Sequence, residues 1–377
     1  MSAAFLPRRT VLAAGLASGL PLRAARARVL TVAAFPLMDK IVEAAQPQWQ
    51  QMHPDVELKV LSRPYADHHT AMTTALSTAV YLPDVMALEQ SFVGRFAQGT
   101  GLDDLSRAPF DIGRHRAHYA PYAYDQATTR SGAVVAAPAD IGPGTLLYRT
   151  DLLAKAGVRP GEGLYFDKDS RVLVNTPRFH RAFEVARKVR QHQLDARVGE
   201  WTNDWAEGFK RGTLATEMSG AWLVGQLNNW VAPATKGLWR ASQLPEGAFA
   251  AYGGAFYAVP RHSAPENKAL AWDFIRLMTL DRARQFAAFK SQDAFPALVD
   301  CYDDPFFDEP LPFLGGQPAR LLWREAAKRI VAMPVHKQTT FADEVITTEL
   351  DHVLDRGKPI PQALADAERL IARRAFR

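Results

Sequence analysis

The sequence predicts an α/β protein of two lobes, each a mostly parallel sheet flanked by helices. The first observation is an alternation, in which the strand-like segments "RVLTVAAF", "VELKVLS" and "PDVMALE" are separated by helical patterns. Strands that alternate with helices are typical of a parallel sheet covered by helices. The second observation is that this alternation restarts after residue 140. Two α/β lobes explain the restart better than a single sheet does.

Residues 1–27 have the features of an export signal. The pair Arg8-Arg9 precedes a mild apolar stretch, and the segment ends in the A-x-A pattern "ARA". The adjacent arginines favour the twin-arginine route, with an ordinary Sec signal or a buried helix as alternatives. The apolar stretch is too short for a permanent membrane span of about 20 residues. No cysteine near the cleavage point offers a lipid anchor, so we expect a mature chain that is free in the periplasm.

Charge and cysteine content exclude two classes of protein. Four of the 45 Lys and Arg residues lie in the signal, which leaves 41 against 40 Asp and Glu residues. A nucleic-acid partner, which needs a clustered basic face, therefore loses its support. Cys301 is the single cysteine, so no intrachain disulfide can form. The remaining 350 of the 377 residues are enough for two domains held by packing alone.

The elements follow in order along both lobes. A helical pattern from Met38 to Trp49 is interrupted by Pro47, and residues 66–80 form the next expected helix. The segment "SGAVVAAPADIGPGTLLYRTDLLAKAG" joins two short strands through a Pro/Gly-rich crossing and predicts a helix that stops at Gly157. Thr176-Pro177 starts another helix. Residues 265–288 are helical in pattern, and the C-terminal helices are broken at Pro334 and Pro359.

Signatures of catalysis and of metal binding are scarce. The chain has no G-x-S-x-G, H-E-x-x-H or G-x-x-x-x-G-K motif. His115 and His118 lack a third ligand at a fixed offset, and a solvated helix face is the better interpretation. His68 and His69 cannot point the same way on a helix. We therefore expect no enzyme, no metal and no cofactor.

Tryptophan is concentrated in one part of the chain. Five of the eight tryptophans fall between Trp201 and Trp239, and the base rate assigns most of them to the core. Trp222 differs because it follows Ser219-Gly220, where a strand ends and a helix begins. Ligands bind at such junctions in parallel sheets, and an indole suits the C–H face of a pyranose.

The pair Gly253-Gly254 stands inside the strand-like run "AAYGGAFYAVP". Glycine weakens a strand, so its presence twice needs a reason. One explanation is a β-bulge or corner. The other is a ligand that lies too close to the backbone for any Cβ to fit.

An ordered set of motifs resembles the extracellular solute-binding proteins of ABC sugar importers, the family-one, maltose-binding-like group. The resemblance implies a two-lobed periplasmic binding protein fold with the ligand cleft between the lobes. The chain crossings are then expected at about Asp140, Val259 and residue 300. The first lobe is 28–139 plus about 260–300, and the second is 140–259 plus about 301–377. The motifs, in chain order, are "HPDVELKV", "LPDVMALE", "APADIGPGTLLYRTDLLAKAG", "MSGAWL", "YGGAFYAVP" and "AWDFIRLMT".

One departure from the family pattern concerns the second lobe. Gly157 runs almost directly into "RPGEGLYFDKDSRVLVN", where relatives insert a further helix, strand and helix. The second lobe is therefore expected to be shortened.

The resemblance also implies a set of ligand-binding residues. For Asp140 at the first crossing, a role as a cap in the hinge is an equal alternative to ligand contact. Glu89 could instead cap the helix that follows it. The implied residues are Phe35, Tyr65, Glu89, Gln90, Asp140, Trp222, Gly253, Gly254 and Asp293.

Three functions follow from these observations. The favoured one is a monomeric periplasmic receptor that delivers a sugar or oligosaccharide to inner-membrane ABC permease subunits. A periplasmic carbohydrate-active enzyme is the second, with a carboxylate pair drawn from Glu89, Asp140 and Asp293. The third is a degenerate clamp that no longer transports, which the shortened second lobe suggests.

Overall fold

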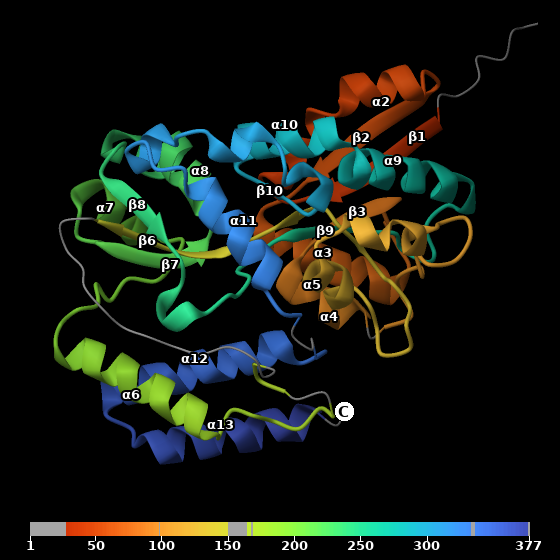
Figure 1. Ribbon diagram of the computed structural model, residues 1–377. Helices are drawn as coiled ribbons and strands as arrows, with labels where there is room; N and C mark the ends of the chain where they lie inside the picture. Colours follow the sequence, from red (N-terminus) through yellow and green to blue (C-terminus); the bar gives the residue numbers. More distant parts are fainter. Residues whose placement is uncertain (1–27, 98, 150–163, 167–168, 333–335, 376–377) are drawn as a thin grey trace, which may run out of the picture.

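The structure is a computed structural model that describes residues 28–97, 99–149, 164–166, 169–332 and 336–375. Figure 1 shows two sheets side by side, each covered by helices, and a group of three helices below them. The predicted export signal and the predicted helix end at Gly157 lie outside the described residues. No helix in the described ranges is both long and apolar enough to span a membrane.

The first lobe is built on a five-stranded sheet with the order β2-β1-β3-β9-β4. β1 pairs in parallel with β2 and β3, whereas β9 is antiparallel to both β3 and β4. The carboxyl ends of β1 and β3 therefore meet at one edge of the sheet. The strands are β1 (Arg28–Ala34), β2 (Val56–Ser62), β3 (Val85–Glu89), β4 (Ala137–Pro138) and β9 (Ala255–Ala258).

Helices cover this sheet largely where the sequence predicts them. Pro47 lies in the first turn of α2, and the predicted break falls just before it. The helical pattern over 265–288 is divided at Asp281, whose side chain caps the second of two helices. The elements are α1 (Met38–Glu43), α2 (Gln46–Met52), α3 (Tyr65–Thr78), α4 (Gln90–Ala97), η1 (Ile112–His118), α5 (Pro121–Gln126), α9 (Lys268–Leu280) and α10 (Arg282–Gln292).

The second lobe corrects the expectation of a mostly parallel sheet. Its three strands have the order β7-β6-β8, and both pairings are antiparallel. The buried apolar residues of this sheet and of the first sheet belong to one continuous cluster. The elements are β6 (Gly144–Arg149), β7 (Thr216–Gly220), β8 (Trp239–Ser242), α7 (Asn203–Arg211), α8 (Leu223–Gln226), the π-helix η2 (Leu227–Val231) and α11 (Ala319–Arg329).

A two-stranded sheet lies close to two of the expected crossings between the lobes. β5 (Asp140–Ile141) pairs antiparallel with β10 (Phe295–Pro296), and crossings near Asp140 and residue 300 stay predictions. β9 belongs to the sheet of the first lobe. We therefore propose that the second crossing lies before Ala255, at the glycine pair, and not at Val259.

The C-terminal helices form a separate unit with a helix from the middle of the chain. α6 (Pro177–Gln191), α12 (Thr339–Arg356) and α13 (Ile360–Ala375) pack on one another around their own hydrophobic cluster. In Figure 1 this unit lies apart from the sheet of the second lobe, and α12 contacts α4 of the first lobe. The sequence division into two lobes did not separate it.

Candidate functional site

A hydrogen-bonded group of predicted site residues lies at the strand ends of the first lobe, and we call it the first wall. Glu89 ends β3, and Tyr65 begins α3. The Tyr65 hydroxyl donates to Glu89 Oε2 over 3.1 Å, and the Ser91 amide donates to the same oxygen over 2.8 Å. Phe35, just after β1, is buried and meets the Tyr65 ring edge-on at 5.6 Å. The structure thus brings together three of the predicted site residues.

A buried histidine that sequence reasoning discounted holds this wall in place. His69 Nε2 accepts a hydrogen bond from the Glu89 amide over 3.1 Å, and His69 Nδ1 contacts the Tyr65 carbonyl oxygen at 2.9 Å. Burial lowers the pKa of His69 to about 4, so the ring is neutral at pH 7. The sequence did offer one signal for this contact. His69 lies four residues after Tyr65, the first residue of α3, and therefore on the same face of the helix.

Burial also sets the protonation of the carboxyl groups at this edge. It raises the pKa of Glu89, although hydrogen bonds from Ser91 and Tyr65 oppose that shift. Burial also raises the pKa of Asp140 to about 6, and the charge of Glu89 raises it further. The Ala255 amide, which donates to the Asp140 carboxylate, lowers the pKa and so opposes this shift. The bond to the Ala255 amide gives Asp140 a structural partner in β9. The hinge cap and the ligand contact both stay predictions for Asp140.

The second wall consists of three aromatic rings from the second lobe and the second crossing. Trp222 lies between the end of β7 and the start of α8, as predicted, although the sheet is antiparallel there. Its ring stacks on Trp201 at 5.7 Å and on Tyr252 at 6.0 Å, and its indole N–H donates to the Tyr252 carbonyl over 2.8 Å. Trp222 is half-buried, whereas Trp201 and Tyr252 are 52% and 43% exposed. The free aromatic faces of this wall therefore belong mainly to Trp201 and Tyr252.

The two walls are joined where the Gln90 backbone N–H, next to Glu89, donates to the Gly254 carbonyl, two residues after Tyr252. Burial raises the pKa of Tyr252, and the charges of Glu200, Glu217 and Glu89 raise it further. Burial likewise raises the pKa of Tyr65, with Glu89 and Tyr252 among the contributors. Hydroxyl, carboxyl and aromatic groups from both lobes thus converge in one region.

The tryptophan segment corrects the prediction that most of its indoles lie in the core. Trp205 and Trp239 are buried, but Trp201 and Trp230 are more than half exposed and Trp222 is half-buried. Exposed indoles of this number in one segment indicate a use other than core packing.

The glycine pair is explained by the protein's own backbone. Gly253 has φ 74° and Gly254 has φ 125°, a region that L side chains rarely adopt. A Cβ on Gly254 would lie 3.1 Å from the Asp140 carbonyl oxygen, and one on Gly253 would lie 3.0 Å from the indole nitrogen of Trp222. A backbone corner, the first of the two explanations, therefore accounts for the positive φ angles of both glycines. Gln90 lies beside this corner, because its backbone N–H donates to the Gly254 carbonyl over 2.9 Å.

Asp293 lies at the end of α10 in the left-handed region, with φ 51°. Its carboxylate packs against Gly225 of α8, where a Cβ would lie 2.5 Å from Asp293 Oδ2. Burial raises the pKa of Asp293 to about 6, and the charge of Arg320 opposes the shift. Asp293 is thus a contact between the lobes.

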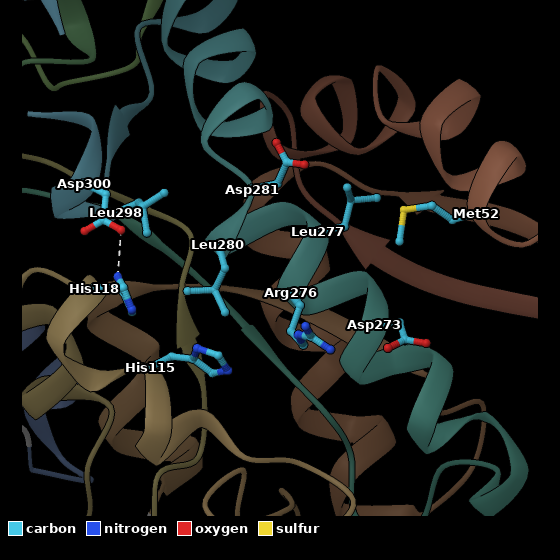
Figure 2. Close-up of a pocket in the computed structure, with 10 residues that line it drawn as sticks. All are labelled: Met52, His115, His118, Asp273, Arg276, Leu277, Leu280, Asp281, Leu298 and Asp300. Carbon is cyan, nitrogen blue, oxygen red and sulfur yellow. Dashed lines mark hydrogen bonds and ion pairs between the residues drawn. The ribbon is translucent and has the colours of Figure 1, made fainter.

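A separate hollow of about 420 Å³ lies on the first lobe, beside α9 (Figure 2). It contains none of the predicted site residues. His118 contacts Asp300 there at 2.7 Å, and no group of three metal-ligating side chains occurs among the described residues. Its lining residues are Met52, His115, His118, Asp273, Arg276, Leu277, Leu280, Asp281, Leu298 and Asp300.

The fold and the site define a two-lobed solute receptor, and the comparisons with known proteins agree. The family model described as bacterial extracellular solute-binding protein matches residues 35–285. The chain therefore belongs to this family, which confirms the resemblance seen in the sequence.

Individual relatives are more distant. The chain is 24% identical to a lactose-binding protein of Rhizobium radiobacter, over 87% of this chain and 88% of that protein. Maltose-bound MalE3 of T. maritima has a TM-score of 0.74 at 18% identity, with 92% and 99% of the two chains covered. A binding protein of B. animalis subsp. lactis Bl-04 in complex with β-1,6-galactobiose has a TM-score of 0.74 at 18% identity, with 93% and 98% covered. These likenesses confirm the two-lobed α/β fold.

Proposed function

We propose that this protein is a periplasmic receptor that binds a sugar or oligosaccharide and delivers it to an ABC importer permease in the inner membrane. The observation that carries the proposal is that the two groups of side chains meet at the glycine pair, where the Gln90 backbone N–H donates to the Gly254 carbonyl. One offers a carboxylate and a phenol, and the other offers aromatic faces. Sugars present hydroxyl groups at their rim and C–H groups on their faces, and such a pair of walls is complementary to both.

Glu89 is the strongest candidate for a hydroxyl contact. The Tyr65 hydroxyl and the Ser91 amide and hydroxyl donate to its Oε2. We propose that the second carboxylate oxygen, Oε1, accepts a bond from a ligand hydroxyl. Gln90, Asp140, Gly253, Gly254 and Asp293 lie at the crossings beside it, and we include them in the proposed site.

Export and partners complete the proposal. The arginine pair at Arg8-Arg9 supports export by the twin-arginine route. We further propose that the receptor acts as a monomer. The permease is inferred from the family and from the relatives that serve ABC transporters. The family and the curated relative are binding proteins, so the carbohydrate-active enzyme is the less favoured alternative.

A sugar screen tests the proposal. Thermal shift against a panel of mono-, di- and trisaccharides that includes lactose and maltose should raise the melting temperature for at least one sugar. In calorimetry, Glu89→Gln should weaken that binding by about tenfold or more, because a charged acceptor is lost. Glu207→Gln, on the surface of α7, is the matched control and should bind normally. Unchanged binding by Glu89→Gln would remove Glu89 from the site, and recovery of a cleaved sugar would favour the enzyme.

A further inference from the structure

Trp201 is an exposed indole in a loop that the resemblance did not assign to the site. It precedes α7 and is 52% exposed, whereas Trp205, one turn into the same helix, is 4% exposed. Burial therefore does not explain why a tryptophan stands at this position.

The backbone of Trp201 is in an unfavourable conformation. Its φ is 65°, in the left-handed region, where a bulky residue is an outlier and where glycine or asparagine would cost less. Residues held in such conformations occur preferentially at ligand sites. A tryptophan thus stands at a position where its backbone conformation is unfavourable.

The loop holds the Trp201 ring nearly parallel to the Trp222 ring of the second wall. Trp201 and Trp222 are stacked with an interplanar angle of 22°, and Trp222 and Tyr252 with one of 20°. Next to Trp201, Glu200 accepts a hydrogen bond from the Tyr252 hydroxyl over 2.8 Å. Thr202 caps α7 by accepting from the Trp205 amide over 3.2 Å. The three rings therefore form an offset series, with Tyr252 at one end and Trp201 at the other.

A purely structural role accounts for only part of this geometry. Trp201 directly precedes the N-cap residue Thr202 and contacts Trp205 at 4.9 Å, which resembles a hydrophobic staple. A leucine would serve as well in that role. A staple requires neither the parallel plane nor the exposed face.

We propose that Trp201 forms a second sugar subsite, so that the ligand of this receptor is an oligosaccharide of at least two rings. This inference rests on the proposed sugar-binding function. The first ring is held between Glu89 and Tyr252. The next ring of the chain lies along the series of aromatic faces and stacks on Trp201.

The test compares sugars of increasing length on three variants. Calorimetry uses galactose with lactose, and glucose with maltose and maltotriose. Trp201→Leu keeps an apolar contact with Trp205 but removes the flat face, Trp201→Phe keeps a flat face, and Trp230→Leu alters an equally exposed indole elsewhere. The wild type should bind the longer sugars more tightly. Trp201→Leu should lose about tenfold or more of that affinity while keeping its affinity for the monosaccharide and its melting temperature. Trp201→Phe should recover most of the loss, and Trp230→Leu should behave as wild type.

Two results would overturn the second subsite. In the first, Trp201→Leu binds the longer sugars with normal affinity. In the second, Trp201→Leu loses affinity for all sugars equally and has a lower melting temperature, as expected if Trp201 acts only as a hydrophobic staple. A wild type that binds no sugar of the panel is a different result, because it rejects the proposed function itself and this inference with it.

Discussion

The first and second walls are held together by different kinds of interaction. The first wall depends on hydrogen bonds, with Glu89 and Tyr65 at strand and helix ends of a partly parallel sheet and His69 buried behind them. The second wall depends on ring packing, with Trp222 between Trp201 and Tyr252 beside an antiparallel sheet. Strand-end geometry supplies a functional edge only in the first lobe. In the second lobe the edge is supplied by aromatic side chains from separate loops.

The largest expected effect concerns the corner that joins the walls. Gly254→Val should destabilise the fold by more than about 3 kcal/mol, because backbone strain adds to a clash with the Asp140 carbonyl. Urea unfolding measures this loss. Gly132→Val is the matched control, since Gly132 has φ 83° and a Cβ there would meet no atom within 4 Å, so it reports the strain alone. A Gly254→Val protein with normal stability and no sugar binding would favour ligand proximity as the reason for the glycine.

Truncation of the middle ring should affect the second wall as a whole. Trp222→Ala removes two ring contacts and the bond to the Tyr252 carbonyl. We expect a loss of about 2 to 3 kcal/mol in stability, somewhat below the cost of a fully buried tryptophan, together with weaker sugar binding. Calorimetry and thermal unfolding of the same sample separate the two effects. A loss of binding alone would show that Trp222 itself is the platform.

A smaller effect is expected from pH at the contact between the lobes. The folded-state pKa of Asp293 is about 6, above its ordinary value of 3.8, so the folded state takes up the proton more readily. Its contribution to stability is full below about pH 4 and is lost as the pH rises through 6. Asp293→Asn should therefore gain roughly 2 kcal/mol relative to wild type between pH 4 and pH 7.5 in urea titrations. The exposed Asp303→Asn is the control, and a pH-independent difference for Asp293→Asn would contradict the burial argument.

The sequence determined the family and several elements of the first lobe. Periodicity predicted a helix over residues 66–80, which is α3 (Tyr65–Thr78), and the break before Pro47, because those signals are local. The ordered motifs led to the solute-binding family, which the match over residues 35–285 confirms. The resemblance implied Glu89 and Tyr65 as site residues, and that role stays a prediction.

Only the tertiary structure decided the features that depend on contacts between distant segments. β9 joins the first sheet by pairing with β3, some 170 residues earlier, and this pairing is the reason for placing the proposed second crossing at the glycine pair. The antiparallel pairing of β6 with β7 and β8 is likewise invisible in strands whose own patterns look alike. Trp201 and Trp205 have the same residue type four positions apart, yet one is exposed and the other buried. That difference arises because a left-handed turn at Trp201 directs its ring along Trp222, and no local pattern encodes the direction of such a turn.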